Sequence, residues 1–374
     1  MSRTMETIFP MDRWDEIRRF MEKNYWSHLP ILDRRIFEWQ FQADLNGGRA
    51  NVGTVWEGGR LIGMLGYMPV DIFWGDVETT RRGAWTANWV VDEDHRGDAG
   101  WLMLRQVGEM FDVTLGIGGK PETLKISKHL GWAVYPHIPR FLAILNKEAA
   151  ASVAGSNLPD VTSVSIPNTA PVLQFLEDEG DYQPDWRHYP HMNHGTVRSY
   201  EHLKRQYIDH PIFRHFILIE GPPERPSLCV FRMQLAYDGE VSVRTGRVVE
   251  FFHPMDEVGK DGGLTLMLNV LAHLRDQGCA YLDIHHCNDL SIATLRRAGW
   301  IEEPAARQTL PGRVCPIDRN HRTTNLIIYA DQANPPVPLS SLFVTGGDGD
   351  EDRAAMHPDL LAPKQPGITI KTGA

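Results

Sequence analysis

The segment VVDEDHRGDAGWLML, residues 90–104, joins two different hydrophobic patterns. The run WTANWVV at 85–91 predicts a strand, and apolar residues at helical spacing predict a helix from about 100 to 111. The turn between them is rich in small residues. At the start of a helix, free backbone N–H groups and the helix dipole stabilise a phosphate, provided that no side chain blocks its approach. The turn is therefore a candidate for anion binding as well as a tight corner.

Outward from this turn, the first half of the chain forms an ordered series of elements. Strands are expected before the turn, at 50–59, 60–76 and 78–91, with glycine-containing connections between them. After the predicted helix come a short strand at 112–119 and a short helix that ends at Gly131, because helices commonly end at a glycine. Extended chain follows at 133–145.

The second half repeats this order with little local identity. It predicts strands over 227–254, an amphipathic helix, a strand, a short helix ending at Gly299, and a late strand at 321–330. The endings KHLGW and RRAGW occupy corresponding places. We predict a tandem of two similar units, with domain bounds 1–150 and 171–332, a linker at 151–170 and a loosely ordered Pro/Gly/acid-rich tail at 333–374.

Three short segments resemble motifs of the GNAT superfamily of acyl-CoA-dependent N-acyltransferases. Residues 90–104 resemble its V-x-x-x-x-R-G-x-G-x-G-x-x-L-L run, and LKISKHLGW at 124–132 resembles its short helix ending in Leu-Gly-aromatic. CNDLSIATLRRAGW at 287–300 resembles the same element with its preceding Asn. The resemblance covers roughly residues 10–330. It implies an α+β fold of two tandem GNAT-like domains, each a mixed, mostly antiparallel sheet flanked by helices.

The resemblance also implies a cosubstrate, acetyl-CoA or another acyl-CoA, and residues that hold it. The phosphate-binding positions in the first unit are Val91, Arg96, Gly97, Ala99 and Gly100. In the second unit, the small residues before the equivalent helix and the Asn before the short helix take this role; they are Gly262, Gly263 and Asn288. Which unit binds CoA is open at this stage.

Attack of an amine on a thioester requires a neutral amine, so a general base or a water relay is expected near a strand end. Candidates in the first unit are Asn88, Glu93, Asp94 and His95. Carboxylates beside a helix start also serve as N-terminal caps and dipole partners. Capping therefore competes with catalysis as the explanation of Glu93 and Asp94.

The run DIHHCN at 283–288 supplies the second set of candidates. Strand alternation places Asp283, His285 and Cys287 on one face and His286 on the other. Two histidines can carry protons near neutral pH, and a cysteine beside them allows a covalent acyl-enzyme. We expect the chemistry to depend more on His285 or His286 than on His95. Buried histidines and a small buried cysteine are the structural alternatives.

Composition limits the partners. Hydrophobic residues are 42% of the chain, and the net charge is −10 without any basic block, which argues against nucleic acid. The N-terminus lacks the apolar core of a signal peptide, and no apolar run is long enough to span a bilayer. Four cysteines without a C-x-x-C pair favour a reduced, cytoplasmic protein, and we expect no metal.

The resemblance to the GNAT superfamily implies an N-acyltransferase that moves an acetyl or similar group to a small amine. The favoured acceptor is an amino sugar or nucleotide-linked amino sugar of surface-glycan synthesis. The alternatives are a Fem-type aminoacyl transferase, which the acidic balance disfavours because tRNA needs a basic track, and a non-catalytic GNAT-like binding module. We expect each unit to need the other for folding, and a homo-oligomer is left open.

Overall fold

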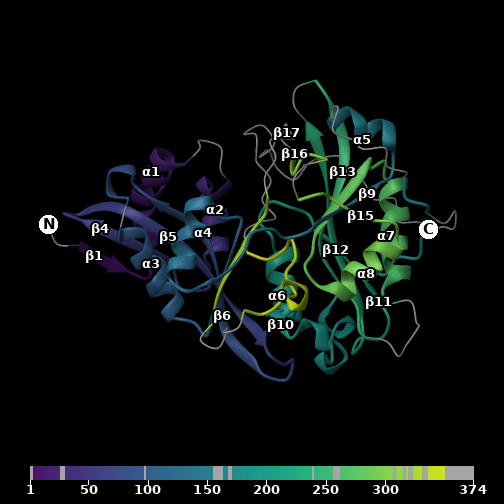
Figure 1. Ribbon diagram of the computed structural model, residues 1–374, viewed down its shortest axis with the longest axis horizontal. Coiled ribbons are helices and arrows are strands. Elements are labelled where there is room, and N and C mark those ends of the chain that lie inside the picture. The colour runs from purple at the N-terminus through teal and green to yellow at the C-terminus, as the bar shows by residue number, and fades with distance from the viewer. Residues whose placement is uncertain are drawn as a thin grey trace.

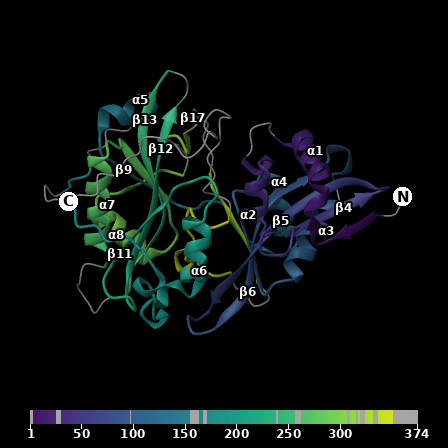
Figure 2. The same ribbon diagram turned by 180° about the vertical axis from the view of Figure 1, so that it is seen from behind.

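The computed structural model describes residues 3–25, 30–96, 98–154, 163–166, 171–237, 240–255, 262–305, 309–314, 317–318, 323–330 and 336–349. Two lobes lie side by side, each built on a sheet with helices against its faces (Figure 1). The N-terminal part of the chain forms one lobe, and most of the second half forms the other. Figure 2 shows the reverse side, with α6 (Tyr200–Leu203) between the lobes.

The first sheet is mixed, because β6 and β7 run parallel while its other described neighbours are antiparallel. Its strand order is β1 (Arg3–Glu6), β4 (Val52–Glu57), β5 (Arg60–Trp74), β6 (Thr80–Val91), β7 (Val113–Ile117), β18 (Leu326–Ala330) and β8 (Ala133–Tyr135). β10 (His194–Thr196) pairs with the far end of β5, and β2 (Phe9–Pro10) with β3 (Arg49–Ala50) forms a small ribbon.

Alternation along the strands gives each face of this sheet its own core. Met64 and Trp85 pack on the face of α1 (Trp14–Asn24) and α2 (Arg34–Gln40). Their neighbours Leu65 and Ala84 pack on the opposite face, against α3 (Asp98–Glu109) and the region of α4 (Pro121–His129). The sheet is therefore covered on both faces.

The second sheet has the same plan, with one parallel pair, β13 and β14. Its order is β11 (Phe216–Glu220), β12 (Ser227–Tyr237), β13 (Ser242–Phe252), β14 (Tyr281–His285), β9 (Arg140–Ile144) and β15 (Ile301–Glu302). α7 (Leu264–Asp276) and α8 (Asp289–Arg297) cover one face, and α5 (Lys147–Ala154) packs on the other. A short ribbon pairs β16 (Arg313–Val314) with β17 (Ile317–Asp318). The predicted α+β fold of two similar mixed sheets flanked by helices is confirmed.

Each sheet contains a strand from the other half of the chain. β9, from the first half, pairs with β14 and β15 in the second sheet, whereas β18, from the second half, lies between β7 and β8 in the first. The two crossing segments meet where Ile138 N–H donates to the carbonyl of Thr324. The predicted domain bounds, 1–150 and 171–332, therefore do not coincide with the limits of the two sheets, because long-range pairing sets those limits.

The tail, expected to be loosely ordered, is buried over residues 342–345. Leu342, Phe343, Val344 and Thr345 are fully buried, and Phe343 N–H donates to the carbonyl of His194. The apolar sequence LSSLFV at 339–344 supplies the reason, since it offers core-forming side chains within a Pro/Gly-rich stretch. No helix among the residues described above is both long and apolar enough to cross a membrane.

Candidate active site

In the first sheet, the parallel strands β6 and β7 pair at one end and then separate. Pairing runs from Gly83 opposite Val113 to Thr86 opposite Gly116. Strand β6 continues to Val91, and α3 begins at Asp98. We call the opening between residues 87–91 of β6 and the end of β7 the first splay. A helix N-terminus therefore stands at the outer end of an opening between two strands.

A β-bulge shapes the inner part of the first splay. Met64 faces Val90 and Gly66 faces Ala87, so that Asn88 and Trp89 share the position opposite Leu65. The φ of Asn88 is +55°, a left-handed conformation that Asn adopts more readily than most other residues. The bulge breaks regular pairing and redirects both side chains.

Two hydrogen-bond donors at this bulge are left without partners. The side chain of Asn88 is buried, and its Oδ1 accepts a hydrogen bond from Gln40 Nε2 at 3.1 Å. Within the part of the chain that the structure describes, Asn88 Nδ2 and Trp89 Nε1 are buried and have no partner. Unpaired buried donors are costly, so they mark a place where a ligand could bind.

The turn from β6 to α3 is held by a buried carboxylate. Asp92 accepts from the backbone N–H of Asp94 and pairs with Lys23 and Arg60, each at 2.7 Å. The hydrogen bond from Lys23, with help from the Asp94 N–H and Arg60, lowers the pKa of Asp92 to about 2. These residues border a depression of about 410 Å³ on the α1 side. Asp92 is the structural cap of this turn.

The predicted site residues of the first unit lie around this cap. Glu93 and Arg96 are exposed and form an ion pair at 3.4 Å, and His95 Nε2 lies 3.2 Å from Glu57 Oε2. Gly97 lies outside the described residues. The structure thus places Glu93 on the surface, where an ion pair with Arg96 accounts for it.

The first turn of α3 packs closely on β6. Ala99 and Gly100 are buried. A Cβ added to Gly100 would lie 3.1 Å from the Trp89 ring and 3.4 Å from Val91 Cγ2. The small residues predicted to admit a phosphate therefore also let the helix approach the bulged strand.

The corresponding opening in the second sheet is filled. β13 and β14 pair only at Gly246 opposite Leu282 and Arg247 opposite Asp283, and we call the opening beyond these pairs the second splay. The tail enters it: Gly347 N–H donates to the Val249 carbonyl on β13, and Thr345 bridges to His286 after β14. The tail therefore occupies the space between the separating strands.

His286 closes the second splay from the other side. Its Nε2 lies 2.9 Å from the carbonyl oxygen of Phe251, and its Nδ1 accepts from the backbone N–H of Asn288. Burial lowers the pKa of His286 to about 4, although the bond to Phe251 opposes that change. With both ring nitrogens engaged, His286 joins β13 to β14, and its catalytic role stays a prediction.

The glycines before α7 pack against a histidine. Gly262 and Gly263 have φ of +43° and +71°, and added Cβ atoms would lie 3.2 and 2.9 Å from the side chain of His253. Thr294 Oγ1 donates to the Gly262 carbonyl. Gly262 and Gly263 therefore form a tight turn that packs against His253 and α8.

The tail is anchored by a buried charge cluster. Arg198 is fully buried and pairs with Asp348 at 2.8 Å and Glu250 at 2.9 Å. Tyr207 donates to Glu250, and Thr196 donates to Asp348 while accepting from Trp85 Nε1. Burial is the main cause that raises the pKa of Glu250 to about 7. This cluster connects the tail to both sheets.

Solved structures provide the comparison, since no protein-family model and no curated protein matches this sequence. The chain is similar to Saccharomyces cerevisiae N-myristoyltransferase with bound myristoyl-CoA (TM-score 0.52, 10% identity, covering 88% of this chain and 78% of that one). It is also similar to a GCN5-related N-acetyltransferase from Kribbella flavida (0.50, 12%, 87% and 70%). A third similar structure is a probable N-acyltransferase of unknown function from Enterococcus faecalis V583 (0.50, 9%, 87% and 72%).

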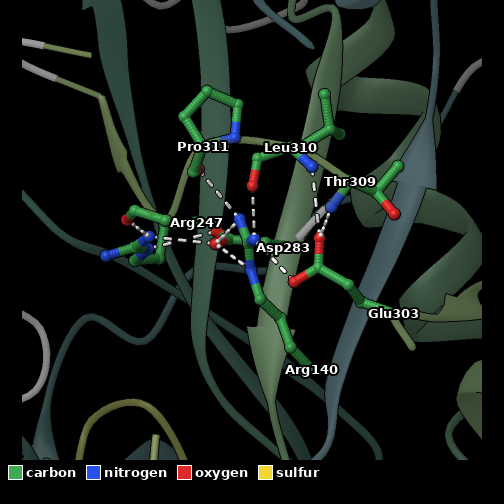
Figure 3. A network of polar contacts seen from close by, with 8 residues as sticks. Arg140, Arg247, Asp283, Glu303, Thr309, Leu310 and Pro311 are labelled. Carbon is green, nitrogen blue, oxygen red and sulfur yellow. Dashed lines mark hydrogen bonds and ion pairs between the residues drawn. The ribbon is translucent and has the colours of Figure 1, made fainter. Parts of the chain in front are cut away.

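This chain has the GNAT fold. The likeness extends over both lobes, because the matches cover most of the chain. Within this GNAT fold, a polar network separate from the Arg198 cluster lies beside β9, the strand that the first half of the chain contributes to the second sheet. Arg140 and Arg247 lie against Asp283, and Arg140 also contacts Glu303 (Figure 3). The network holds a loop as well, through the Leu310 and Pro311 carbonyls.

Asp283 has a role in that network. Burial by itself would raise the pKa of Asp283, but Arg247 and Arg140 outweigh it and hold the pKa well below its ordinary value. Both carboxylate oxygens accept from guanidinium groups. Asp283 thus links β9 to β14 through its ion pair with Arg140, and its catalytic role stays a prediction.

Of the other predicted residues of the second GNAT-like unit, Cys287 and Asn288 are buried just before α8, and His285 is half-buried at the end of β14. Asn288 caps that helix by accepting from the backbone N–H groups of Leu290 and Ser291. Cys287 is a buried thiol, and burial raises its pKa, which disfavours the thiolate that an acyl-enzyme needs. His285 keeps a buried Nδ1 without a partner among the described residues, and burial lowers its pKa to about 3.

Reasoning from sequence missed the residue that orients Asn88 and the residues that connect the GNAT-like units. Gln40, which orients Asn88, lies within an ordinary amphipathic helix. Asp348 belongs to the run DGDED, interpreted above as part of an acidic tail, and Arg198 and Glu250 carry no motif. The apolar stretch just before Asp348 was the available signal. Within the described residues, no group of three or more candidate ligands could hold a metal ion.

Proposed function

We propose that this protein is an acyl-CoA-dependent N-acyltransferase whose first splay holds the acyl-CoA and whose acceptor is a small amine. The observation that carries the proposal is the combination, within a GNAT fold, of the N-terminus of α3 with separated strands and unpartnered donors. Backbone N–H groups at 96–100 would bind the pyrophosphate. The pantetheine arm would then follow β6 toward Asn88.

The proposal prefers the first splay because the protein itself fills the second. The tail lies beside Val249, and His286 bridges to Phe251 where an acyl chain would have to pass. Gly262 and Gly263 support this preference, because they contact His253. Acyl-CoA binding to the second splay would require expulsion of buried tail residues from the core.

Transfer requires that the amine attack the thioester carbon in its neutral form, lose a proton and release the CoA thiolate. Among the predicted bases, His285 is neutral at neutral pH because burial lowers its pKa to about 3. Its unpartnered Nδ1 can accept a hydrogen bond, but it is a weak base. Because His285 also lies on β14 in the second sheet, the proposal lets the amine lose its proton to solvent.

For the acceptor, the proposal favours an amino sugar or a nucleotide-linked amino sugar, and acetyl as the acyl group. The support is the resemblance of the sequence to family members that act in glycan synthesis. A panel of amines that includes glucosamine, a nucleotide-linked amino sugar and a peptide N-terminus, assayed by release of the CoA thiol, separates these acceptors. Thiol release with the peptide alone would contradict the sugar assignment.

Calorimetric titration of the full chain with CoA and acetyl-CoA tests the proposal. We expect binding to the wild type, and at least a tenfold loss in Gly97→Pro, because proline removes a backbone N–H from the turn. Gly262→Ala, a change in the corresponding turn of the second unit, should leave CoA affinity unchanged. Absence of CoA binding by the wild type, or a loss confined to Gly262→Ala, would overturn the proposal. Binding without thiol release for any amine would identify a non-catalytic module.

A further inference from the structure

The side-chain amide of Asn88 is buried, and only one of its two polar atoms has a hydrogen-bond partner among the described residues. It is 6% exposed, its backbone is left-handed, and its Oδ1 is held by Gln40 Nε2. Its Nδ2 has no partner among the residues that the structure describes. A buried amide donor without an acceptor destabilises the folded state unless a bound molecule supplies one. The amide is therefore oriented for a partner that the described residues do not supply.

The position of Asn88 indicates which molecule that partner belongs to. It follows closely on Thr86, the last residue of β6 paired with β7, at the inner end of the first splay. Gln40 is the last residue of α2, so the amide lies on the α2 face of the sheet. The α3 N-terminus, proposed to hold the pyrophosphate, lies at the outer end of the same strand. The reactive end of a bound acyl-CoA would thus reach Asn88.

The chemistry of a carboxamide indicates which atom of the bound acyl-CoA Asn88 contacts. An amide N–H donates a hydrogen bond and cannot take up the proton of an amine, so it requires an oxygen acceptor. We propose that Asn88 Nδ2 donates a hydrogen bond to the carbonyl oxygen of the acyl-CoA thioester, and that Gln40 is the positioning residue that aims it. This inference rests on the proposed function and deepens it by naming a catalytic residue.

In the reaction, the amine nitrogen forms a bond to the carbonyl carbon, and the π pair of the C=O bond moves to oxygen. Asn88 Nδ2 stabilises this negative charge, which is larger than the partial charge of the ground state. The pair then re-forms C=O, the C–S bond breaks, and the CoA thiolate leaves with both electrons. The ammonium proton passes to solvent, and the thiolate regains a proton there.

A pair of ligands that differ only at that oxygen tests the inference. Acetyl-CoA carries the carbonyl, whereas S-ethyl-CoA has the same length without it. We expect the wild type to bind acetyl-CoA about tenfold more tightly, as one buried hydrogen bond allows. In Asn88→Gly, which retains the left-handed backbone, the two ligands should bind equally, with the affinity for S-ethyl-CoA unchanged.

Controls separate this result from damage to the fold. Asn146→Gly, an asparagine change at the start of α5, should keep the full preference for acetyl-CoA. Gln40→Leu should reduce the preference several-fold while leaving S-ethyl-CoA affinity intact, an outcome that a merely structural role would not produce. A preference that survives in Asn88→Gly, or equal losses for both ligands, would overturn the inference. If the wild type binds neither ligand, the proposed function itself fails, which is a distinguishable result.

Discussion

In the first sheet, β6 and β7 separate after Thr86, and the donors of Asn88 and Trp89 remain without partners among the described residues. In the second, β13 and β14 separate after Arg247, and the chain fills the opening with His286 and the tail. The same strand arrangement therefore serves two purposes. One copy leaves two side-chain donors without partners among the described residues, while the other bonds the Val249 and Phe251 carbonyls within the protein.

The comparison shows why a repeated fold does not imply a repeated function. A splay exposes backbone groups of two strands, and these groups need partners from either a ligand or the protein. In the second sheet, the carbonyls of Val249 and Phe251 obtain protein partners. Function is thus decided by what occupies the splay, and the fold alone does not reveal this.

The largest effect is expected from separating the halves. Residues 1–155 expressed alone would lack β18, which leaves β7 and β8 with unpaired edges, and β9 would have no sheet to join. We expect this fragment to aggregate and co-expression with residues 156–374 to restore a soluble complex. Size-exclusion chromatography and circular dichroism provide the measurement. A monomeric fragment that unfolds cooperatively would show that the units are independent.

The next effect tests the anchor of the tail. Arg198→Met removes the guanidinium between Glu250 and Asp348 and leaves two buried carboxylates without a counter-charge. We expect the free energy of unfolding to fall by about 3–5 kcal/mol, as when one partner of a buried pair is lost. Urea denaturation measures this loss, with the exposed Arg105→Met as control. A loss below about 1 kcal/mol would mean that the cluster is not closely coupled to folding.

Acid should lower the free energy of unfolding through His286, the buried histidine at the second splay. The pKa of His286 is about 4 in the folded state and about 6.5 when unfolded, so the unfolded state binds more protons between these values. The contribution of His286 to the free energy of unfolding is complete above pH 6.5. It is lost as pH falls toward 4, by up to about 3 kcal/mol. His286→Gln should reduce this pH dependence, whereas the exposed His129→Gln should not. Equal pH dependence in all three proteins would contradict the expectation.

The last effect concerns Glu250; it is similar in size to that of His286 and has the opposite sign. Its folded pKa of about 7 lies above the ordinary 4.5, so the folded state binds more protons in that window. Its contribution to stability is present below pH 4.5 and is lost as pH rises toward 7, by at most about 1.4 kcal/mol per pH unit. The stability of Glu250→Gln relative to wild type should therefore increase between pH 5 and 7. A difference that is constant with pH would mean that Glu250 is ionised throughout.

The local hydrophobic pattern was sufficient to predict the main strands and helices around the two splays. Alternating and helical hydrophobic spacing predicted β4, β5, β6, α3 and α7, because these periods depend only on neighbouring residues. The expected helix stops were also found, since Gly131 and Gly299 have φ of +82° and +86°, which other residues rarely adopt. Capping of the β6–α3 turn by a carboxylate was anticipated as well, although the residue is Asp92 rather than Glu93.

Sequence by itself thus determined the main strands and helices around the two splays, their order and the α+β class. Only the tertiary structure decided that β9 and β18 change sheets, that Asp283 and His286 fasten strands, and that the tail fills one splay and leaves the other. The physical reason is distance along the chain. A short apolar run shows that it will be buried but not beside which strand, and a carboxylate or imidazole shows its charge but not the partner that will neutralise or bind it.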